Sequence, residues 1–405
     1  MRRLPCLLAL VTPLALLAGC DDSDEAFDAG PVIVIDAELP PDTAPPEDLP
    51  DAAPDAAPEP DMAPPDPGGL AVLGNGWHTI DKVTLEVIGT EADGLNVPRD
   101  LEFDPKNPDH LWTVNRAFDG TAMFSGVGTE DQTVDVRSDV FADHFMEEVA
   151  ALSFGDNGDF ATIHESRNTY NNVGFPNDFM GPTLWDADLQ VYCAVNQDRN
   201  GGLLGSHIDM LHQSPLSMGI AHHKDNAYWV FDGLNGHIVY YDFKQDHGPG
   251  YDDHSDGVVR RYVEAAVLRV PNVPSHLYND KSSGWLYIAD TGNGRILRLD
   301  TKTGAVDGSF QPRAEPLVEY SRVRGVTVQV FVATGLTAPS GIAFHGGRLF
   351  VSDYATGDIV AYDLNGKEID RLATGARGLM GITFGPEGKL YFVDGRDDLA
   401  VRVDP

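Results

Sequence analysis

Apolar and polar residues alternate in short runs along most of this chain, and the clearest example lies at residues 273–300. A Leu-Tyr-Ile-Ala-Asp run at 286–290 follows a Lys-Ser-Ser-Gly turn, and an Arg-Ile-Leu-Arg-Leu-Asp run at 295–300 follows Thr-Gly-Asn-Gly. Alternation between Gly-rich turns is typical of antiparallel strands with one buried face. The pattern at 273–300 therefore predicts most of one small sheet. Neighbouring sheets are needed to cover the apolar faces of this sheet.

The same pattern recurs six times along the chain. We expect the first strand of each repeat at 97–103, 148–154, 217–222, 274–278, 339–344 and 379–384. We expect the second strands at 111–115, 160–164, 227–232, 286–290, 349–353 and 390–394. Third strands are clear at 237–243, 295–300, 358–363 and 399–404. Because each unit is too small to bury its own faces, the repeats predict sheets that pack against one another.

The repeats resemble those of NHL-type β-propellers, which read Pro-x-Gly-Ile-Ala, then Leu-Tyr-Val-Ala-Asp, then Asn-Arg-Ile. The resemblance covers about residues 80–405 and implies an all-β, six-bladed β-propeller at 70–405. The last repeat stops after its third strand, whereas an extra strand with alternating Val83, Leu85 and Val87 precedes the first repeat. We expect this strand, at 82–88, to complete the last blade and close the ring, which leaves few open edges.

The N-terminus has the composition of a targeting signal. Arg2 and Arg3 precede an apolar run at 4–17 that is too short to span a membrane as a stable helix. The run ends in Leu-Ala-Gly-Cys and resembles the bacterial lipobox, in which the cysteine becomes lipidated. This resemblance implies a lipoprotein signal peptide at 1–19. It also implies that lipid on Cys20 anchors the chain to a membrane of the bacterial cell envelope, on its periplasmic or outer surface.

An acidic segment rich in Pro and Ala follows at 20–69 and contains no Lys or Arg. Charge repulsion and proline stiffness predict a disordered tether there. The whole chain has a formal net charge of -35 at pH 7. This balance excludes nucleic acid as a partner, because its phosphates require a basic surface.

Polar residues end the second strands, which we expect to share one face of the propeller. They are Asn115, His164, Asp232, Asp290, Asp353 and Asp394. An Asp at such a position commonly caps the following turn through the backbone. The alternative is a functional polar rim around the central channel.

Two residues depart from the pattern at the position where the first strand normally has Gly. Gly allows the close backbone approach that the crowded axis requires. Asp100 and His276 instead place polar side chains beside the channel. For each of them the alternatives are a structural role and a functional one.

Two long segments, 167–180 and 197–215, are expected as loops on the face where the second strands end. Long ordered loops over a propeller mouth are commonly functional. We expect these side chains to converge there: Asp100, His164, Glu165, His207, Asp209, His212 and His276. Imidazoles with an open position suit zinc, and added carboxylates suit manganese, iron or calcium. Glu165 and His276 are the candidate catalytic groups that would move a proton.

On the opposite face, the loop at 244–257 contains Asp252, Asp253 and Asp256. These residues are a candidate calcium loop, although the spacing lacks the glycine and final Glu of an EF-hand. The alternative is a solvated polar loop.

Two classes of function follow. The first is a non-catalytic module that binds a protein, a glycan or a small molecule through the face bearing 165–215. The second is a metal-dependent hydrolase or lyase. Here the chain resembles two propeller families distantly: the peptidyl-hydroxyglycine amidating lyases, whose axial zinc ligands would include His276, and the gluconolactonase-like enzymes, whose axial ion would lie near Asn115, Asp232 and Asp290.

Overall fold

The computed structural model describes residues 69–76, 78–79, 82–167, 179–195, 202–251, 253–313 and 315–405. The predicted signal peptide at 1–19, Cys20 and nearly all of the predicted tether at 20–69 lie outside these residues, as does Asp252. Within the described part of the chain, every helix is too short or too polar to cross a membrane.

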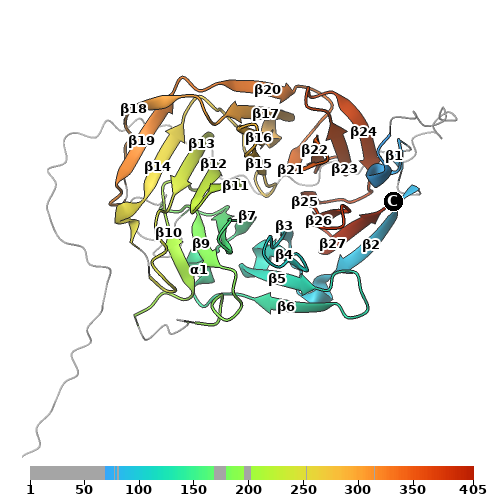
Figure 1. Cartoon of the computed structure of the whole chain (residues 1–405), viewed down its shortest axis with the longest axis horizontal. Helices are drawn as coiled ribbons and strands as arrows, with labels where there is room; N and C mark the ends of the chain where they lie inside the picture. Colours follow the sequence, from blue (N-terminus) through green and yellow to red (C-terminus); the bar gives the residue numbers. More distant parts are fainter. Residues whose placement is uncertain are drawn as a thin grey trace, which may run out of the picture. The chain divides into compact units, whose positions relative to one another are not determined.

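Six sheets, each built on four antiparallel strands, surround a common axis and form the blades of a propeller (Figure 1). Blade 1 contains β3 (Pro98–Phe103), β4 (His110–Asn115), β5 (Gly120–Ser125) and β6 (Thr133–Arg137). Blade 2 contains β7 (Val149–Phe154), β8 (Asp159–His164), β9 (Thr183–Asp186) and β10 (His207–Met210), with α1 (Ala142–Phe145) before it. Blade 3 contains β11 (Gly219–Lys224), β12 (Ala227–Asp232), β13 (His237–Asp242) and β14 (Val258–Tyr262). The predicted fold class is confirmed.

The remaining blades follow in chain order. Blade 4 contains β15 (Leu277–Asp280), β16 (Trp285–Asp290), β17 (Arg295–Asp300) and β20 (Val328–Val332). Blade 5 contains β21 (Pro339–His345), β22 (Arg348–Asp353), β23 (Asp358–Tyr362) and β24 (Glu368–Ala373), to which the short β1 (His78–Thr79) adds in parallel. Blade 6 contains β25 (Leu379–Phe384), β26 (Leu390–Asp394), β27 (Leu399–Asp404) and the N-terminal β2 (Thr84–Gly89).

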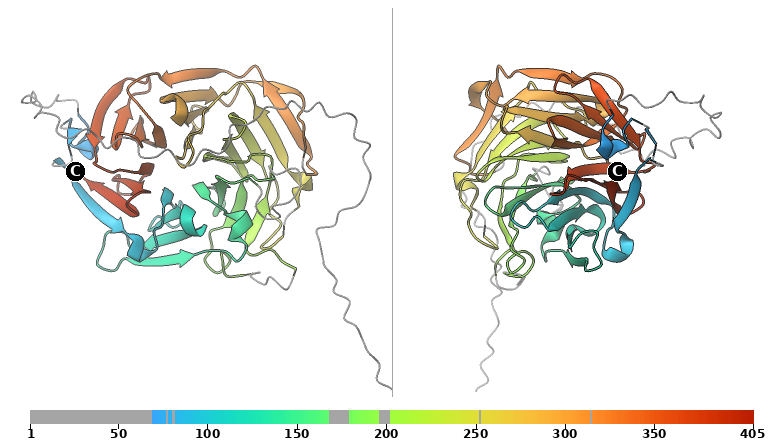
Figure 2. Two further views of the ribbon diagram at one scale, coloured as in Figure 1. Left: turned by 180° about the vertical axis from the view of Figure 1, so that it is seen from behind. Right: turned by 45° about the vertical axis from the view of Figure 1, so that its right-hand side comes forward.

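The predicted closure of the ring is confirmed by β2, which pairs antiparallel with β27 (Figure 2). Thr84 lies opposite Asp404, and the pairing continues to a register shift between Val87 and Gly89. The shift changes which side chains face the core, because an extra residue reverses the alternation. Ile88 is therefore buried whereas Val87 is exposed, contrary to the simple alternation expected from the sequence.

The segment at 197–215, expected as a loop leading into blade 3, contains the outer strand of blade 2. This strand, β10, pairs with β9, and its other edge receives the loop at 244–257. The backbone N–H of Gly250 donates to His207 O at 2.8 Å, and that of His247 donates to Ile208 O at 3.3 Å. The expectation that these two segments lie on opposite faces is therefore wrong, because the outer strand offers an edge that the loop covers.

A hairpin inserted between the third and fourth strands of blade 4 extends blade 3. It comprises β18 (Ala305–Ser309) and β19 (Glu319–Arg324), and β19 pairs in parallel with β14. Figure 1 shows both strands outside β14. A bidentate ion pair between Arg260 and Glu319, with both oxygens at 2.8 Å, fixes the register of this addition. The sheet of blade 3 consequently has six strands.

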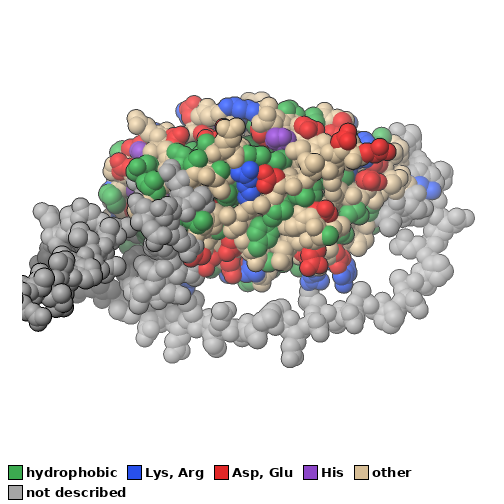
Figure 3. All heavy atoms as spheres, turned by 90° about the horizontal axis from the view of Figure 1, so that it is seen from below, with side chains coloured by type: hydrophobic (Ala, Val, Ile, Leu, Met, Phe, Trp, Pro, Cys, Tyr) green, Lys and Arg blue, Asp and Glu red, His purple; other side chains and the backbone are tan. Residues whose placement is uncertain are grey.

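The apolar core lies between neighbouring blades. Between blades 2 and 3, for example, Leu184 and Ile208 pack with Tyr228, Val230 and other buried residues. Around the rim, Figure 3 shows acidic and basic side chains interspersed on the side drawn. This arrangement leaves the axis as the place where the first strands of all the blades meet.

Candidate functional site

Glycines at the axis are required by close backbone contacts between neighbouring blades. A Cβ on Gly219 would lie 2.0 Å from Ser275 O, and one on Gly341 would lie 2.4 Å from Met380 O. Neither site can accept a side chain without a shift of the backbone. The sequence-based explanation of these glycines is therefore correct, and the two residues that replace glycine occupy a constrained place.

Asp100 and His276 contact each other at the axis. His276 Nδ1 lies 3.3 Å from Asp100 Oδ2, and its Nε2 lies 3.3 Å from Arg99 O. The Asp100 carboxylate also accepts the backbone N–H groups of Leu101 at 2.9 Å and Leu152 at 3.1 Å. Both side chains are buried. The carboxylate thus holds the imidazole in one orientation, as a general base or a ligand-binding group requires.

An axial pocket of ≈ 480 Å³ begins beside this pair. The inner strands of all six blades, β3, β7, β11, β15, β21 and β25, contribute to its wall. The exposed turn at 280–282 also lines it, so the pocket opens on the side where the first strands end. This side is opposite to the ends of the second strands, where sequence reasoning expected the binding loops.

Polar groups that the sequence did not single out for function line the pocket. Lys281 Nζ lies 2.8 Å from His222 Nδ1 and 3.0 Å from Asp156 Oδ1. The Asn279 amide donates to His222 O at 3.1 Å. His222 lies in β11 on the pocket wall, where burial lowers its pKa. The imidazole of His222 is therefore neutral at neutral pH.

Glu102 lies in β3, two residues after Asp100, and also faces the pocket. Burial raises the pKa of Glu102 to about 8, although the carboxyl accepts the backbone N–H of Phe154 at 2.9 Å. Near pH 7 this side chain is mostly a carboxylic acid and can donate a hydrogen bond as well as accept one.

Glu165 belongs to neither group of potential metal donors in the described residues and instead binds two arginines. Its carboxylate accepts from Arg99 Nη1 at 3.0 Å, from Arg269 Nη1 at 2.5 Å and from the Asn272 backbone N–H at 2.8 Å. Both Glu165 and Arg99 are buried. The geometry gives Glu165 a bridging role between blades 1, 2 and 4.

The expected convergence of seven side chains at one mouth is wrong. His207 and Asp209 lie on the outer strand β10, and His212 follows it, whereas Asp100 and His276 lie on the axis. The His207 ring stacks on Phe145 with centroids 3.7 Å apart. The separation arises because the segment at 197–215 forms an outer strand instead of a loop.

His164, at the end of β8, is buried. Its Nε2 lies 3.2 Å from Thr162 Oγ1, and burial lowers the pKa of His164 to about 3. The imidazole is therefore neutral.

Two groups of three potential metal donors occur within the described residues, and both lie outside the axial pocket. One is His212, His254 and Glu315; the other is Asp209, His247 and Asp256. At the axis, Gly219 and Gly381 provide no side-chain donors beside His276. The axial zinc site implied by the amidating-lyase resemblance therefore does not fit this chain.

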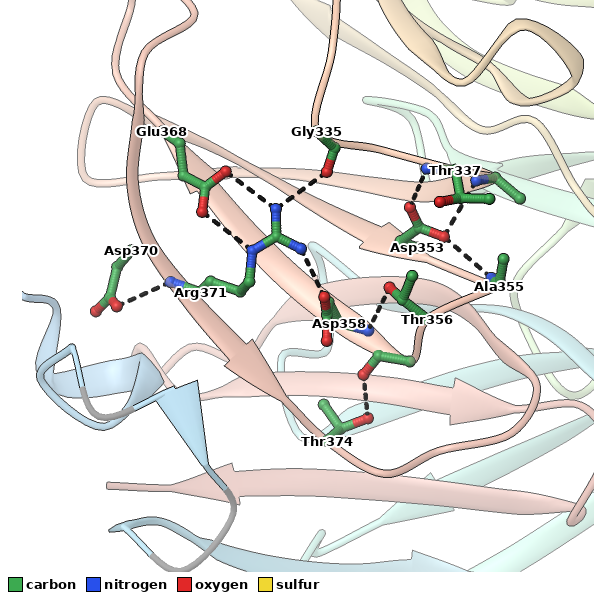
Figure 4. A network of polar contacts seen from close by, with 12 residues as sticks. Gly335, Thr337, Asp353, Ala355, Thr356, Asp358, Glu368, Asp370, Arg371 and Thr374 are labelled. Atoms are coloured by element: carbon green, nitrogen blue, oxygen red, sulfur yellow. Dashed lines mark hydrogen bonds and ion pairs between the residues drawn. The ribbon is translucent and has the colours of Figure 1, made fainter. Parts of the chain in front are cut away.

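The polar residues that end the second strands bind the backbone of adjoining loops. Asp353 accepts from the N–H groups of Thr337 at 2.5 Å, Ala338 at 3.1 Å and Ala355 at 3.0 Å (Figure 4). Four other members of the set make similar bonds: Asn115 with Asn96, Asp232 with Leu234 and Asn235, Asp290 with Leu268, and Asp394 with Arg377 and Arg396. These contacts match the capping role. They also occupy the side-chain oxygens that would bind the axial ion implied by the resemblance to gluconolactonase-like enzymes.

The described part of the candidate calcium loop does not gather its acids at one point. Asp253 accepts the Ser255 N–H at 3.0 Å and caps the short 3-10 helix η5 (His254–Asp256). Asp256 instead faces His247, with 3.3 Å between Oδ1 and Nε2.

No family model and no curated protein matches this chain. Among solved structures, it is similar to an auxiliary nutrient binding protein from Bacteroides thetaiotaomicron, with 13% identity and a TM-score of 0.50 over 79% of this chain and 75% of that one. The fold is shared. A similar protein from Bacteroides ovatus has 15% identity and a TM-score of 0.48 over 80% and 76% of the two chains. Regucalcin, a calcium-binding protein from Agrobacterium tumefaciens, has 13% identity and a TM-score of 0.46 over 80% and 95%. At these identities the comparisons show the propeller architecture and a distant resemblance only.

Proposed function

We propose that this protein is a binding module that takes an uncharged, hydroxyl-rich small molecule of saccharide size into the axial pocket. The observation that carries the proposal is the pocket itself, in which polar groups and aromatic side chains line one cavity of ≈ 480 Å³. Ligand pockets of about 300–1,000 Å³ commonly combine apolar walls with a few fixed polar groups.

The charges around the pocket favour a neutral ligand. Asp100 contacts His276, and Lys281 is paired with Asp156. Glu102 is mostly protonated near neutral pH, because burial raises its pKa to about 8. The wall therefore offers hydrogen bonds without a strong field of one sign.

Aromatic side chains provide the apolar contacts of the pocket. Phe154, Tyr278, Phe344 and Phe384 line the pocket, and the rings of Tyr278 and Phe344 stack with centroids 5.6 Å apart. Such rings cover the apolar face of a sugar, while the carboxyl and amide groups bind its hydroxyls. The nutrient-binding name of the Bacteroides thetaiotaomicron protein is compatible with this class of ligand.

The localisation that we propose rests on the sequence. Lipid on Cys20 would hold the chain at a membrane of the cell envelope, and the acidic segment at 20–69 would separate the propeller from the membrane. The face on which the second strands end stays a second candidate surface for a protein or glycan partner.

Calorimetry with a panel of mono- and disaccharides tests the proposal. We expect at least one ligand to bind with 1:1 stoichiometry, and Lys281→Met to weaken it by about tenfold through loss of a hydrogen-bond donor. Lys389→Met is the matched control, because Lys389 lies at the equivalent turn of blade 6 and outside the pocket wall. Equal affinity in both variants, or no binding by any saccharide, would contradict the proposal.

A hydrolase or lyase acting in the same pocket is the second candidate, and the oriented Asp100–His276 pair favours it. His276 would move the proton while Asp100 stabilises the imidazolium. Turnover of a bound saccharide that is lost in His276→Gln, with binding retained, would support catalysis over binding alone.

A further inference from the structure

Three side chains from three blades meet beside the outer strands, away from the axial pocket. His212 follows β10 of blade 2, His254 lies in η5 just before β14 of blade 3, and Glu315 lies between β18 and β19 of the hairpin inserted from blade 4. His212 Nδ1 is 2.7 Å from Glu315 Oε2, and His254 Nδ1 is 2.9 Å from the same oxygen. The three donor atoms all lie within 4.8 Å of one another.

We propose that His212, His254 and Glu315 bind a Zn²⁺ ion that joins blades 2 and 3 to the inserted hairpin. Two imidazoles and one carboxylate form a ligand set that zinc commonly uses, with a fourth position for water or another oxygen donor. Calcium and magnesium prefer oxygen ligands throughout, so the two nitrogens argue against them.

The donor spacing requires only a small adjustment. Zinc bonds of about 2.0–2.1 Å at tetrahedral angles place neighbouring donors about 3.3 Å apart. The present separations of 2.7 and 2.9 Å from Glu315 Oε2 would therefore open by a few tenths of an ångström. His254 belongs to a surface loop, which permits such a movement.

The surroundings orient the carboxylate and one imidazole before any ion arrives. The other oxygen of Glu315, Oε1, accepts the backbone N–H of His212 at 2.8 Å. The His212 ring stacks on Phe179 with centroids 3.4 Å apart, and its carbonyl accepts the Tyr241 hydroxyl at 2.8 Å. Contacts that fix the ligands in this way increase metal affinity.

Burial makes a cation favourable at this place. Glu315 is buried, and the guanidinium of Arg313, two residues away, donates to the backbone carbonyls of Glu315 and Leu317. The hydrogen bonds to the Glu315 carboxylate come from His212 and His254. A divalent ion would compensate the buried negative charge, which is costly without a cationic partner.

The second group of potential donors, Asp209, His247 and Asp256, is the weaker candidate for a metal site. His247 Nε2 is 3.9 Å from Asp209 Oδ2 and 3.3 Å from Asp256 Oδ1, and both His247 and Asp256 are partly exposed. This group nevertheless gives a matched control, because His247 lies in the same loop as His254.

Zinc titration of the full chain, after chelation and dialysis, tests the inference. We expect one equivalent to bind, and Co²⁺ in its place to show the intense visible absorption of a tetrahedral site. Glu315→Gln and His254→Gln should each weaken zinc binding by more than about 100-fold, beyond the loss expected for an outer-shell contact. His247→Gln should bind zinc with the affinity of the unaltered chain.

The outcomes separate this site from the axial pocket. No stoichiometric zinc, or zinc binding that survives both substitutions, would overturn the inference, as would loss in His247→Gln alone. If Glu315→Gln does not fold, His254→Gln decides, because His254 lies at the surface end of the group. Zinc lost in His276→Gln instead would place a metal on the axis. Saccharide binding does not depend on this site, so either proposal can fail alone.

Discussion

Glu165 of blade 2 accepts a hydrogen bond from Arg99 of blade 1 at 3.0 Å, and both side chains are buried. Arg269, in the segment that leads into blade 4, binds the other oxygen of the same carboxylate at 2.5 Å. Three blades are thus joined through one carboxylate. Such a contact fixes the relative positions of blades that are distant in the sequence.

Glu165→Gln should therefore destabilise the propeller. The substitution leaves the buried Arg99 guanidinium without its counter-ion, and breaking a buried pair in this way costs about 3–5 kcal/mol. Urea unfolding followed by tryptophan fluorescence measures the loss. Asp307→Asn, in the exposed pair of Asp307 with Arg322, is the control and should cost less than about 1 kcal/mol. Equal midpoints for the two variants would contradict a bridging role.

Removal of residues 70–88 should open the ring. The deletion takes away Leu73 and Ile88, which are buried, and leaves β27 with an unpaired edge. Loss of two large apolar side chains and a strand ladder costs at least about 5 kcal/mol, which lowers Tm by about 7 °C or more in a domain of this size. Calorimetry of the full chain, the chain without residues 1–69 and the chain without residues 1–88 provides the test. We expect the first two to melt together, and a third melting point equal to theirs would refute closure by β2.

The elements that the sequence predicts correctly are those whose apolar runs reflect burial. The run at 286–290 corresponds to β16, which is buried along most of its length. By contrast, β18 has only exposed residues, because strand pairing to β19 holds it in place and no apolar face is buried. The strand β10 was likewise not predicted, because His207 and Asp209 interrupt its apolar pattern and its pairing partners come from distant segments.

The candidate site was predictable where it departs from the repeat. Asp100 and His276 are recognisable because they replace a glycine that the axis requires. Glu102 was overlooked, although a residue two positions after Asp100 on a strand faces the same side. No local pattern identifies Glu315, because its role depends on a hairpin that crosses to another blade.

Asp353→Ala should lower stability without changing the affinity of the axial pocket. Its carboxylate accepts three backbone N–H groups, from Thr337, Ala338 and Ala355. Leaving such donors unsatisfied costs about 1–3 kcal/mol each where water cannot replace the acceptor. Chemical denaturation measures the change, and Asp363→Ala, at an exposed turn, should have a smaller effect. Weaker ligand binding at full stability would instead indicate that the strand-end residues belong to the binding surface.

Glu102 should make the stability of the propeller depend on pH. Burial raises the pKa of Glu102 from 4.5 to about 8 in the folded chain. The folded state therefore retains the proton that the unfolded chain loses. The stability contributed by this proton is complete below about pH 4.5, and it is lost as the pH rises towards 8. A difference of this size corresponds to at most about 5 kcal/mol.

Glu102→Gln removes this dependence while keeping a neutral side chain of similar shape. Relative to the unaltered chain, the variant should gain stability steadily between pH 5 and pH 9, as measured by urea unfolding at each pH. Glu130→Gln, on an exposed loop, should give the same difference at every pH. Saccharide binding to the unaltered chain should also weaken above about pH 8, because the ionised carboxylate no longer donates a hydrogen bond. A constant difference between Glu102→Gln and the unaltered chain would show that Glu102 is already ionised at neutral pH, and the neutral ligand class would then lose its support.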